Sequence, residues 1–295
     1  MHHTSLTSPW TTKISEKNHG FTTHQRLSSR NKEIKLPDLD FADDLALMDD
    51  GIDEAQLHTD DVARECKKVG LEVNVGKTEY STYNINTDKG ITINNKQLKK
   101  TDNFKYLGSM TRSSRDDITR RRALAFSTFY TMNNIWSNSV IPIPLKVKIF
   151  KVSVLTVFLY GCESWTLNEA DKDSINSFAT TCYRRILDID QAIEHVTNKE
   201  VLKRVKSTEL ILHIQKRQLE KTGHRLRKPE SSLANRFALY VPKHGRRGPG
   251  RPRTSFTNTI TNIINPTVRL SEAEVRRHAQ DRDSWKEMIK DRTTQ

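Results

Sequence analysis

The sequence predicts an α+β fold, with short strands in the first part of the chain and helices in the remainder. Between residues 34 and 110, short apolar runs are separated by turn-forming residues, which is typical of small strands joined by tight turns. From Ser113 onward, apolar residues recur at steps of three and four, which indicates amphipathic helices. Residues 1–33 are polar and lack clear periodicity, so we expect them to be irregular.

The strand-rich part contains one predicted helix. "IKLPDLDFADDLALM" predicts two short strands joined at the pair Asp43-Asp44, and "GIDEAQLHTDDVARECKKVGL" predicts a helix that ends at Gly70. The expected buried stripe of this helix comprises Ile52, Ala55, Thr59, Val62, Cys66 and Val69. Further strands are predicted in "EVNV", "KTEYSTYNI", "GITIN" with a turn at Asn94-Asn95, "KQLK" and "NFKYLGSM".

Several helices are predicted after Ser113. They cover about 118–138, a stretch from Pro142 and Pro144 to Tyr160, the segment "NEADKDSINSFATTCYRRIL", two or three pieces of 197–227, and about 271–291. The expected buried faces comprise Ile118, Ala125, Phe129, Met132, Trp136, Ile175, Phe178, Cys182, Ile186, Ala273, Val275, Trp285 and Ile289. Residues 242–254 are rich in Pro, Gly and Arg and predict an exposed linker.

Charge is the strongest compositional signal. The chain has 49 Lys and Arg against 36 Asp and Glu, and the net charge of +13 favours a polyanionic partner, although a solubilising surface has the same composition. Cys66, Cys162 and Cys182 follow no metal-binding spacing, so we expect reduced core thiols in an intracellular protein, cytoplasmic or nuclear. We expect neither secretion nor a membrane segment, because the most apolar stretch, 152–160, has nine residues, about half of what a bilayer requires.

Asp43 and Asp44 lie in the predicted turn between two strands. Two neighbouring carboxylates repel each other, so a divalent cation between them would stabilise the turn. Oxygen ligands of this kind suit Mg²⁺ or Mn²⁺. An ordinary aspartate-rich hairpin turn explains the pair at least as well when the turn is considered alone. Asp49 and Asp50 are expected to be the polar start of the following helix, with no metal role.

The order of the motifs resembles the reverse transcriptases of non-LTR (LINE-type) retrotransposons. "LPDLDFADDLALM" is similar to the catalytic hairpin of their palm, "GLEVNVGKTEY" to the next palm element and "FKYLGS" to the primer-grip hairpin, and "PLKVKIF" and "LTVFLYGCESW" also have counterparts. The resemblance covers roughly residues 20–255. It implies a partial palm of short antiparallel strands and one helix at 34–112, a helical thumb at 113–165, a helical C-terminal region at 166–241, and a basic linker with a terminal helix at 242–295.

The resemblance also implies roles for individual residues. Asp43 would bind the two catalytic ions, and Asp44 would complete the metal site by helping to shape or neutralise it. Lys77 would act on the leaving pyrophosphate, unless it lies in a solvent-facing turn. Contacts with nucleic acid would come from Phe104, Tyr106, Leu107 and Gly108 of the primer grip, and from Arg246, Arg247, Arg251 and Arg253 of "GRRGPGRPR". The implied partners are an RNA template with a DNA primer, or an RNA–DNA hybrid.

The chain departs from this family before the Asp43 turn. The two-metal mechanism requires another carboxylate from an earlier palm strand, and the 42 residues before Asp43 contain no plausible copy. Asp38 and Asp40 are expected to point away from Asp43, because side chains alternate along a strand. We therefore expect a polymerase fragment that is inactive alone and binds a dNTP only if the missing palm and fingers are supplied. The alternatives are a non-enzymatic nucleic-acid-binding remnant and an unstable product that aggregates through its exposed palm edge.

Overall fold

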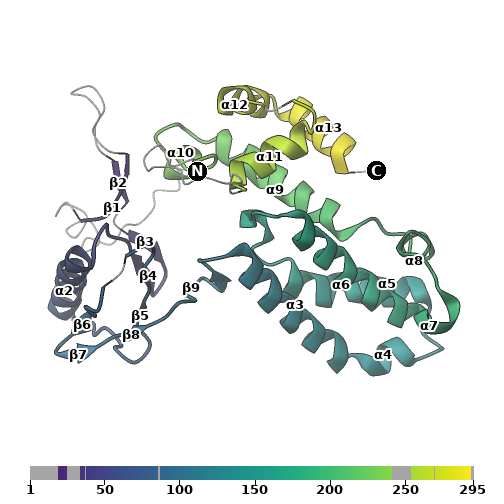
Figure 1. The fold of residues 1–295 in the computed structure, drawn as a ribbon, viewed down its shortest axis with the longest axis horizontal. Helices are drawn as coiled ribbons and strands as arrows, with labels where there is room; N and C mark the ends of the chain where they lie inside the picture. The colour runs from purple at the N-terminus through teal and green to yellow at the C-terminus, as the bar shows by residue number, and fades with distance from the viewer. Residues whose placement is uncertain are drawn as a thin grey trace. The chain divides into compact units, whose positions relative to one another are not determined.

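The computed structural model describes residues 19–24, 34–36, 38–85, 87–240, 254–268 and 270–293. These residues form two compact units, of which the first ends at Arg112 and the second begins at Ser113 (Figure 1). The first unit contains short strand pairs and one helix, and the second unit is helical, so the predicted α+β class is confirmed. None of the helices in the described ranges is both long enough and apolar enough to cross a lipid bilayer.

The strands of the first unit form two-stranded pairs. The antiparallel pairs are β1 (Phe21–His24) with β2 (Ile34–Leu36), β3 (Asp38–Phe41) with β4 (Asp44–Leu47), β6 (Thr92–Ile93) with β7 (Lys96–Gln97), and β9 (Lys105–Tyr106) with β10 (Ser109–Met110). The pair β5 (Glu79–Tyr80) with β8 (Lys99–Lys100) is parallel, which differs from the antiparallel strands expected of this region. The predicted turn at Asn94-Asn95 joins β6 to β7, and both asparagines have positive φ.

Strand β1 lies in a segment that the sequence predicts to be irregular. It pairs with β2, and the backbone N–H of Thr22 donates to both carboxylate oxygens of Asp50 at 3.1 Å. Both contacts come from residues that follow later in the chain. The local sequence of residues 21–24 therefore cannot reveal what orders this strand.

Helix α2 (Ile52–Lys68) packs against strand β4. Val62 and Cys66 of the helix form a small core with Leu45 and Leu47 of the hairpin. Val62 and Cys66 are buried as the periodicity predicts, but Val69, at the end of the expected stripe, is 53% exposed because the helix has already ended at Lys68.

Helices make up the second unit. They are α3 (Ser114–Thr131), α4 (Asn133–Ser137), α5 (Ile143–Phe158), η1 (Cys162–Ser164), α6 (Glu169–Leu187), α7 (Gln191–Glu194), α8 (Asn198–Arg204), α9 (Leu210–Leu226), α10 (Leu233–Arg236), α11 (Phe256–Ile264), α12 (Glu272–Gln280) and α13 (Arg282–Thr293). The helix predicted for 118–138 is interrupted at Met132, and the helix predicted for 271–291 is divided at Asp281. Ala273 is exposed, in contrast to the prediction, and α11 forms in a segment where the sequence predicts no helix.

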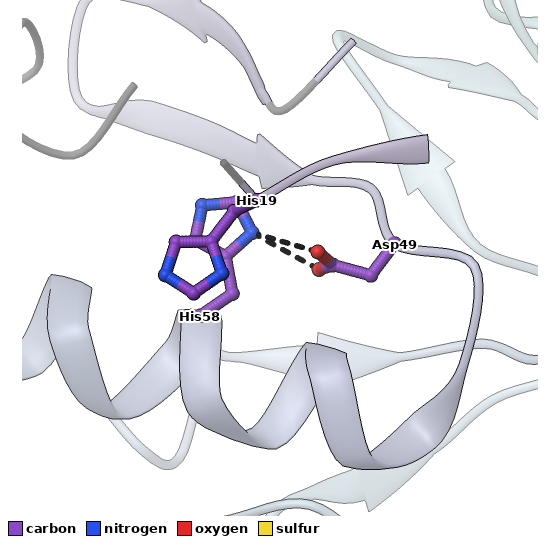
Figure 2. Close-up of side chains that lie close together, drawn as sticks. All are labelled: His19, Asp49 and His58. Atoms are coloured by element: carbon purple, nitrogen blue, oxygen red, sulfur yellow. Dashed lines mark hydrogen bonds and ion pairs between the residues drawn. The ribbon is translucent and has the colours of Figure 1, made fainter. Parts of the chain in front are cut away.

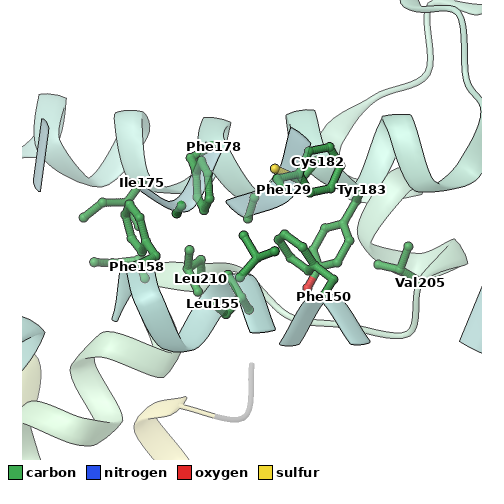
Figure 3. Close-up of a cluster of buried hydrophobic side chains, with 14 of the residues drawn as sticks. Phe129, Phe150, Leu155, Phe158, Ile175, Phe178, Cys182, Tyr183, Val205 and Leu210 are labelled. Carbon is green, nitrogen blue, oxygen red and sulfur yellow. The ribbon is translucent and has the colours of Figure 1, made fainter. Parts of the chain in front are cut away.

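Two apolar clusters hold the second unit together, and α9 contributes to both. The first cluster contains aromatic side chains of α3, α5 and α6, among them Phe129, Phe150 and Phe178, which lie among one another in Figure 3. The second cluster joins Leu219 and Leu226 of α9 to residues of α11, α12 and α13 and to Ala238 and Leu239, which follow α10. Shared packing on α9 therefore makes the helices after Ser113 one unit.

The three cysteines are buried and form no disulfide, as expected of core thiols. Burial raises the pKa of Cys162 and of Cys182 to about 12 and also raises the pKa of Cys66. Because the thiolate is the reactive form, these side chains act as packing groups and are poor nucleophiles.

Candidate functional site

Asp43 and Asp44 lie at the tip of the β3–β4 hairpin. Phe41 pairs directly with Asp44, so Ala42 and Asp43 form a two-residue turn. Ala42 adopts a φ of 54°, a left-handed conformation that costs a residue other than glycine about 1 kcal/mol. Both aspartates are exposed. The two strands joined at the aspartate pair are therefore present as the sequence predicts, and both carboxylates face solvent at the tip.

The register of the hairpin separates the acidic side chains into two groups. Asp38 pairs with Leu47 and Asp40 with Leu45, so these four side chains share one face of the hairpin. Asp44 pairs with Phe41 and lies on the opposite face. Burial and then the neighbouring Asp40 carboxylate raise the pKa of Asp38, while His58 acts in the opposite direction. The carboxylates of Asp38 and Asp40 therefore repel each other when both are ionised, on the face of the hairpin that packs against α2.

The "FKYLG" motif forms a second tight hairpin. Tyr106 pairs with Ser109 across a turn of Leu107 and Gly108, which have φ values of 47° and 77°. The phenolic O–H of Tyr106 donates to the backbone carbonyl of Leu39 in β3 at 2.8 Å. This bond brings together two motifs that are 67 residues apart in the chain.

The Tyr106 phenol lies close to the carboxylates of the acidic hairpin, and they affect its ionisation. Burial raises its pKa, and the carboxylates of Asp40, Asp44 and Asp38 raise it further, in that order. A phenol whose ionised form is disfavoured remains a hydrogen-bond donor at neutral pH. Tyr106 therefore links the second hairpin to the first as a neutral group.

The other residues singled out in the sequence lie apart from the aspartate pair. The backbone N–H of Lys77 donates to the Asn74 side-chain oxygen at 3.1 Å, so Asn74 supports the loop, and both residues are exposed. In the described chain, no hydrogen bond or ion pair connects Lys77 with Asp43 or Asp44. Phe104 is half-buried, and its carbonyl accepts the N–H of Thr111 at 3.0 Å. Arg246, Arg247, Arg251 and Arg253 lie outside the described residues.

Asp43 and Asp44 fit only one side of a two-metal centre. Mg²⁺ and Mn²⁺ require several oxygen ligands, and two ions require carboxylates on both sides. In the ranges that the structure describes, neither aspartate belongs to a group of three or more His, Cys, Asp or Glu side chains with ligand atoms within 4.8 Å. A further carboxylate would therefore have to come from beyond those ranges.

A group of potential ligands occurs elsewhere in the first unit, at residues whose sequence spacing predicts no metal site. His19, Asp49 and His58 each offer a ligand atom within 4.8 Å of the others (Figure 2). Asp49 is not an exposed residue at the polar start of a helix, since its side chain is 2% exposed and accepts from the backbone N–H of Gly20 at 3.2 Å. His19 and His58 are far apart in the sequence, so their spacing could not reveal the group. The available signal is that His58 directly precedes Thr59, which the periodicity of the helix predicts to be buried and which is buried in the structure.

Lys151 of α5 and Lys216 of α9 lie near His213, and these three residues define the cationic area of α5 and α9 in the second unit. Burial lowers the pKa of His213, and the charges of Lys151 and Lys216 lower it further. Lys216 is exposed. This cationic area suits a polyanion, because Lys side chains on phosphates release condensed counterions.

Comparison with known proteins supports a transposon origin. The chain is 27% identical over 283 residues to a putative uncharacterized transposon-derived protein of Caenorhabditis elegans. The aligned region covers 91% of this chain and 99% of the relative. No protein-family model matches the chain. No solved structure matches it either.

Proposed function

We propose that the chain is a fragment of the RNA-directed DNA polymerase of a non-LTR retrotransposon, which binds nucleic acid but does not extend primers alone. The hydrogen bond from Tyr106 to Leu39 carries this proposal, because it joins the acidic "FADD" hairpin to the "FKYLG" hairpin. In a polymerase palm of the type that the sequence resembles, the first hairpin binds metal and the second contacts the primer. The similarity to a transposon-derived protein supports the same origin.

The proposed catalytic residues are incomplete without the rest of a polymerase. Asp43 and Asp44 would contribute to binding Mg²⁺ or Mn²⁺, and Lys77 would approach the pyrophosphate, once an upstream palm strand and fingers supply the further carboxylate and the dNTP site. Alone, the hairpin presents two exposed carboxylates. We therefore assign no reaction step to this chain by itself.

We expect no primer extension by the purified chain. The assay supplies an RNA template annealed to a DNA primer, the four dNTPs, and Mg²⁺ or Mn²⁺, with an active reverse transcriptase as the positive control. The expected product remains at background, because the Asp43-Asp44 turn has no third ligand among the described residues. The variant Asp43→Asn is the control: extension by the wild type that disappears in this variant would contradict the prediction of inactivity.

A non-enzymatic nucleic-acid-binding remnant is the second candidate, and the cationic area of α5 and α9 favours it. If about four phosphates are neutralised, the affinity for an RNA–DNA hybrid should fall about 100-fold between roughly 50 and 200 mM salt. Fluorescence anisotropy of a labelled hybrid measures this dependence. An affinity that does not change with salt would contradict both candidates.

Charge reversal locates the binding surface. We expect Lys151→Glu combined with Lys216→Glu to weaken hybrid binding about tenfold, because two favourable phosphate contacts become repulsive. Lys199→Glu, at an exposed position of α8, is the matched control and should change binding little. Alanine substitution of Arg246, Arg247, Arg251 and Arg253 tests the basic segment separately. Equal effects of the α5/α9 pair and the control would place the binding surface elsewhere.

A further inference from the structure

We propose that His19, Asp49 and His58 form a binding site for a single Zn²⁺ ion, separate from the aspartates of the β3–β4 hairpin. The three residues come from three different segments: the chain just before β1, the loop after β4, and helix α2. Figure 2 shows the two imidazole rings lying side by side with the Asp49 carboxylate beside them. An ion at this place would connect all three segments.

The distances in this group are close to those that a bound ion requires. Nδ1 of His58 lies 3.0 and 3.2 Å from the two carboxylate oxygens of Asp49. Zinc binds nitrogen and oxygen at about 2.0–2.2 Å, so ligand atoms in a tetrahedral site lie roughly 3.4 Å apart. All three ligand atoms already lie within 4.8 Å of one another. Movements of about 1 Å therefore suffice to form the site.

His19 is the side chain best placed to make that movement. Its ring stacks on the His58 ring with centroids 4.5 Å apart and planes at 6°, so one ring must tilt for both nitrogens to point at a common ion. The His19 side chain is 13% exposed, whereas the His58 side chain is 0% exposed and held within α2. The less buried ring meets less packing resistance to tilting.

Neighbouring polar groups suit a metal-bound imidazole pair. Nε2 of His19 lies 3.0 Å from an Asp61 carboxylate oxygen, which is the outer carboxylate–histidine contact typical of protein metal sites. Nδ1 of His58, which faces the Asp49 carboxylate, is the nitrogen that would bind the ion, and Nε2 of the same ring is buried without a hydrogen-bond partner among the described residues.

The ligand types select the ion. Two imidazoles and one carboxylate suit Zn²⁺ and related transition-metal ions, whereas Mg²⁺ prefers oxygen ligands alone. Water would complete four-coordinate geometry around the three protein ligands. The site is therefore chemically distinct from the one that Asp43 and Asp44 would contribute to a polymerase, and its function would be to fasten the segment at β1 to α2.

Calorimetric titration of the metal-free full-length chain with ZnCl₂ tests the proposal. We expect one site whose affinity falls at least tenfold in His19→Ala and in Asp49→Asn, and Zn²⁺ should raise the melting temperature of the wild type. His224→Ala, at an exposed position near the end of α9, is the matched control and should bind like the wild type. Titration with MgCl₂ should give no binding at this site.

The choice of variants keeps the test decisive. His58→Ala removes a fully buried ring and can unfold the first unit, so the partly exposed His19 provides the primary variant, and circular dichroism checks that each variant is folded. Absence of Zn²⁺ binding by the wild type would overturn the proposal. Equal affinity in folded His19→Ala and His224→Ala would also overturn it, because the ion would then be bound by other histidines.

Discussion

Replacing Asp117 by alanine is expected to lower the free energy of unfolding by about 3 kcal/mol. Asp117 is 1% exposed in α3, and its carboxylate accepts the indole N–H of Trp165 at 2.8 Å. The same carboxylate lies 3.9 Å from Nε of Arg121, which is itself 7% exposed. The substitution removes the acceptor of a buried donor and a negative charge beside a buried cation, and each loss is costly because water cannot replace it.

Two further substitutions separate these contributions. Asp117→Asn keeps an oxygen acceptor for Trp165 but removes the charge, so we expect about half of the loss. Asp116→Ala, at the exposed neighbouring position of the same helical turn, should cost less than about 1 kcal/mol. Urea unfolding followed by tryptophan fluorescence measures all three. Equal losses at Asp116 and Asp117 would show that the buried contacts contribute nothing.

Gly223→Ala is expected to destabilise the second unit by about 1–2 kcal/mol, although alanine is the better helix former. Gly223 lies in α9, and a Cβ atom there would overlap Nε1 of Trp285 and lie 2.8 Å from its Cδ1. The indole is 2% exposed, and its N–H donates to the carbonyl of Leu219 at 3.0 Å. Overpacking costs about 1–3 kcal/mol, whereas the gain in helix propensity is about 1 kcal/mol, so the steric cost is expected to be larger.

Gly90→Ala provides the control for this glycine. A Cβ at Gly90 would meet the end of the Gln97 side chain, with Cδ at 3.3 Å, but that side chain is exposed and flexible. We expect a change within about 0.5 kcal/mol. Thermal unfolding followed by circular dichroism compares the two variants. A melting temperature of Gly223→Ala equal to or above that of the wild type would show that α13 moves away from α9 at little cost.

The proposed palm fragment leaves apolar side chains exposed on one face of its acidic hairpin. Leu39 is 40% exposed and Phe41 is 63% exposed, and both share a face with Asp44. Two-stranded sheets have two open edges, and exposed apolar edges pair readily with other chains. The hairpin therefore offers both an apolar face and open strand edges to another chain.

Much of the secondary structure could be predicted because its signals are local. The apolar periodicity that predicts α6 is confirmed, with Ile175, Phe178, Cys182 and Ile186 buried. The hairpins at Asp43 and Asn94-Asn95 follow from turn residues between short apolar runs. Helix breaks at Met132 and Asp281 were not predicted, because the apolar repeat continues across both positions.

The sequence alone determined the α+β class, the helical repeat after Ser113 and the acidic turn at Asp43-Asp44, since each depends on residues close in the chain. The tertiary structure alone decided which distant segments meet. It placed the Tyr106 phenol on the backbone of β3, paired β5 with β8 in parallel, ordered β1 through Asp50, and brought His19 to Asp49 and His58. Such contacts depend on long-range pairing and burial, which local periodicity does not encode.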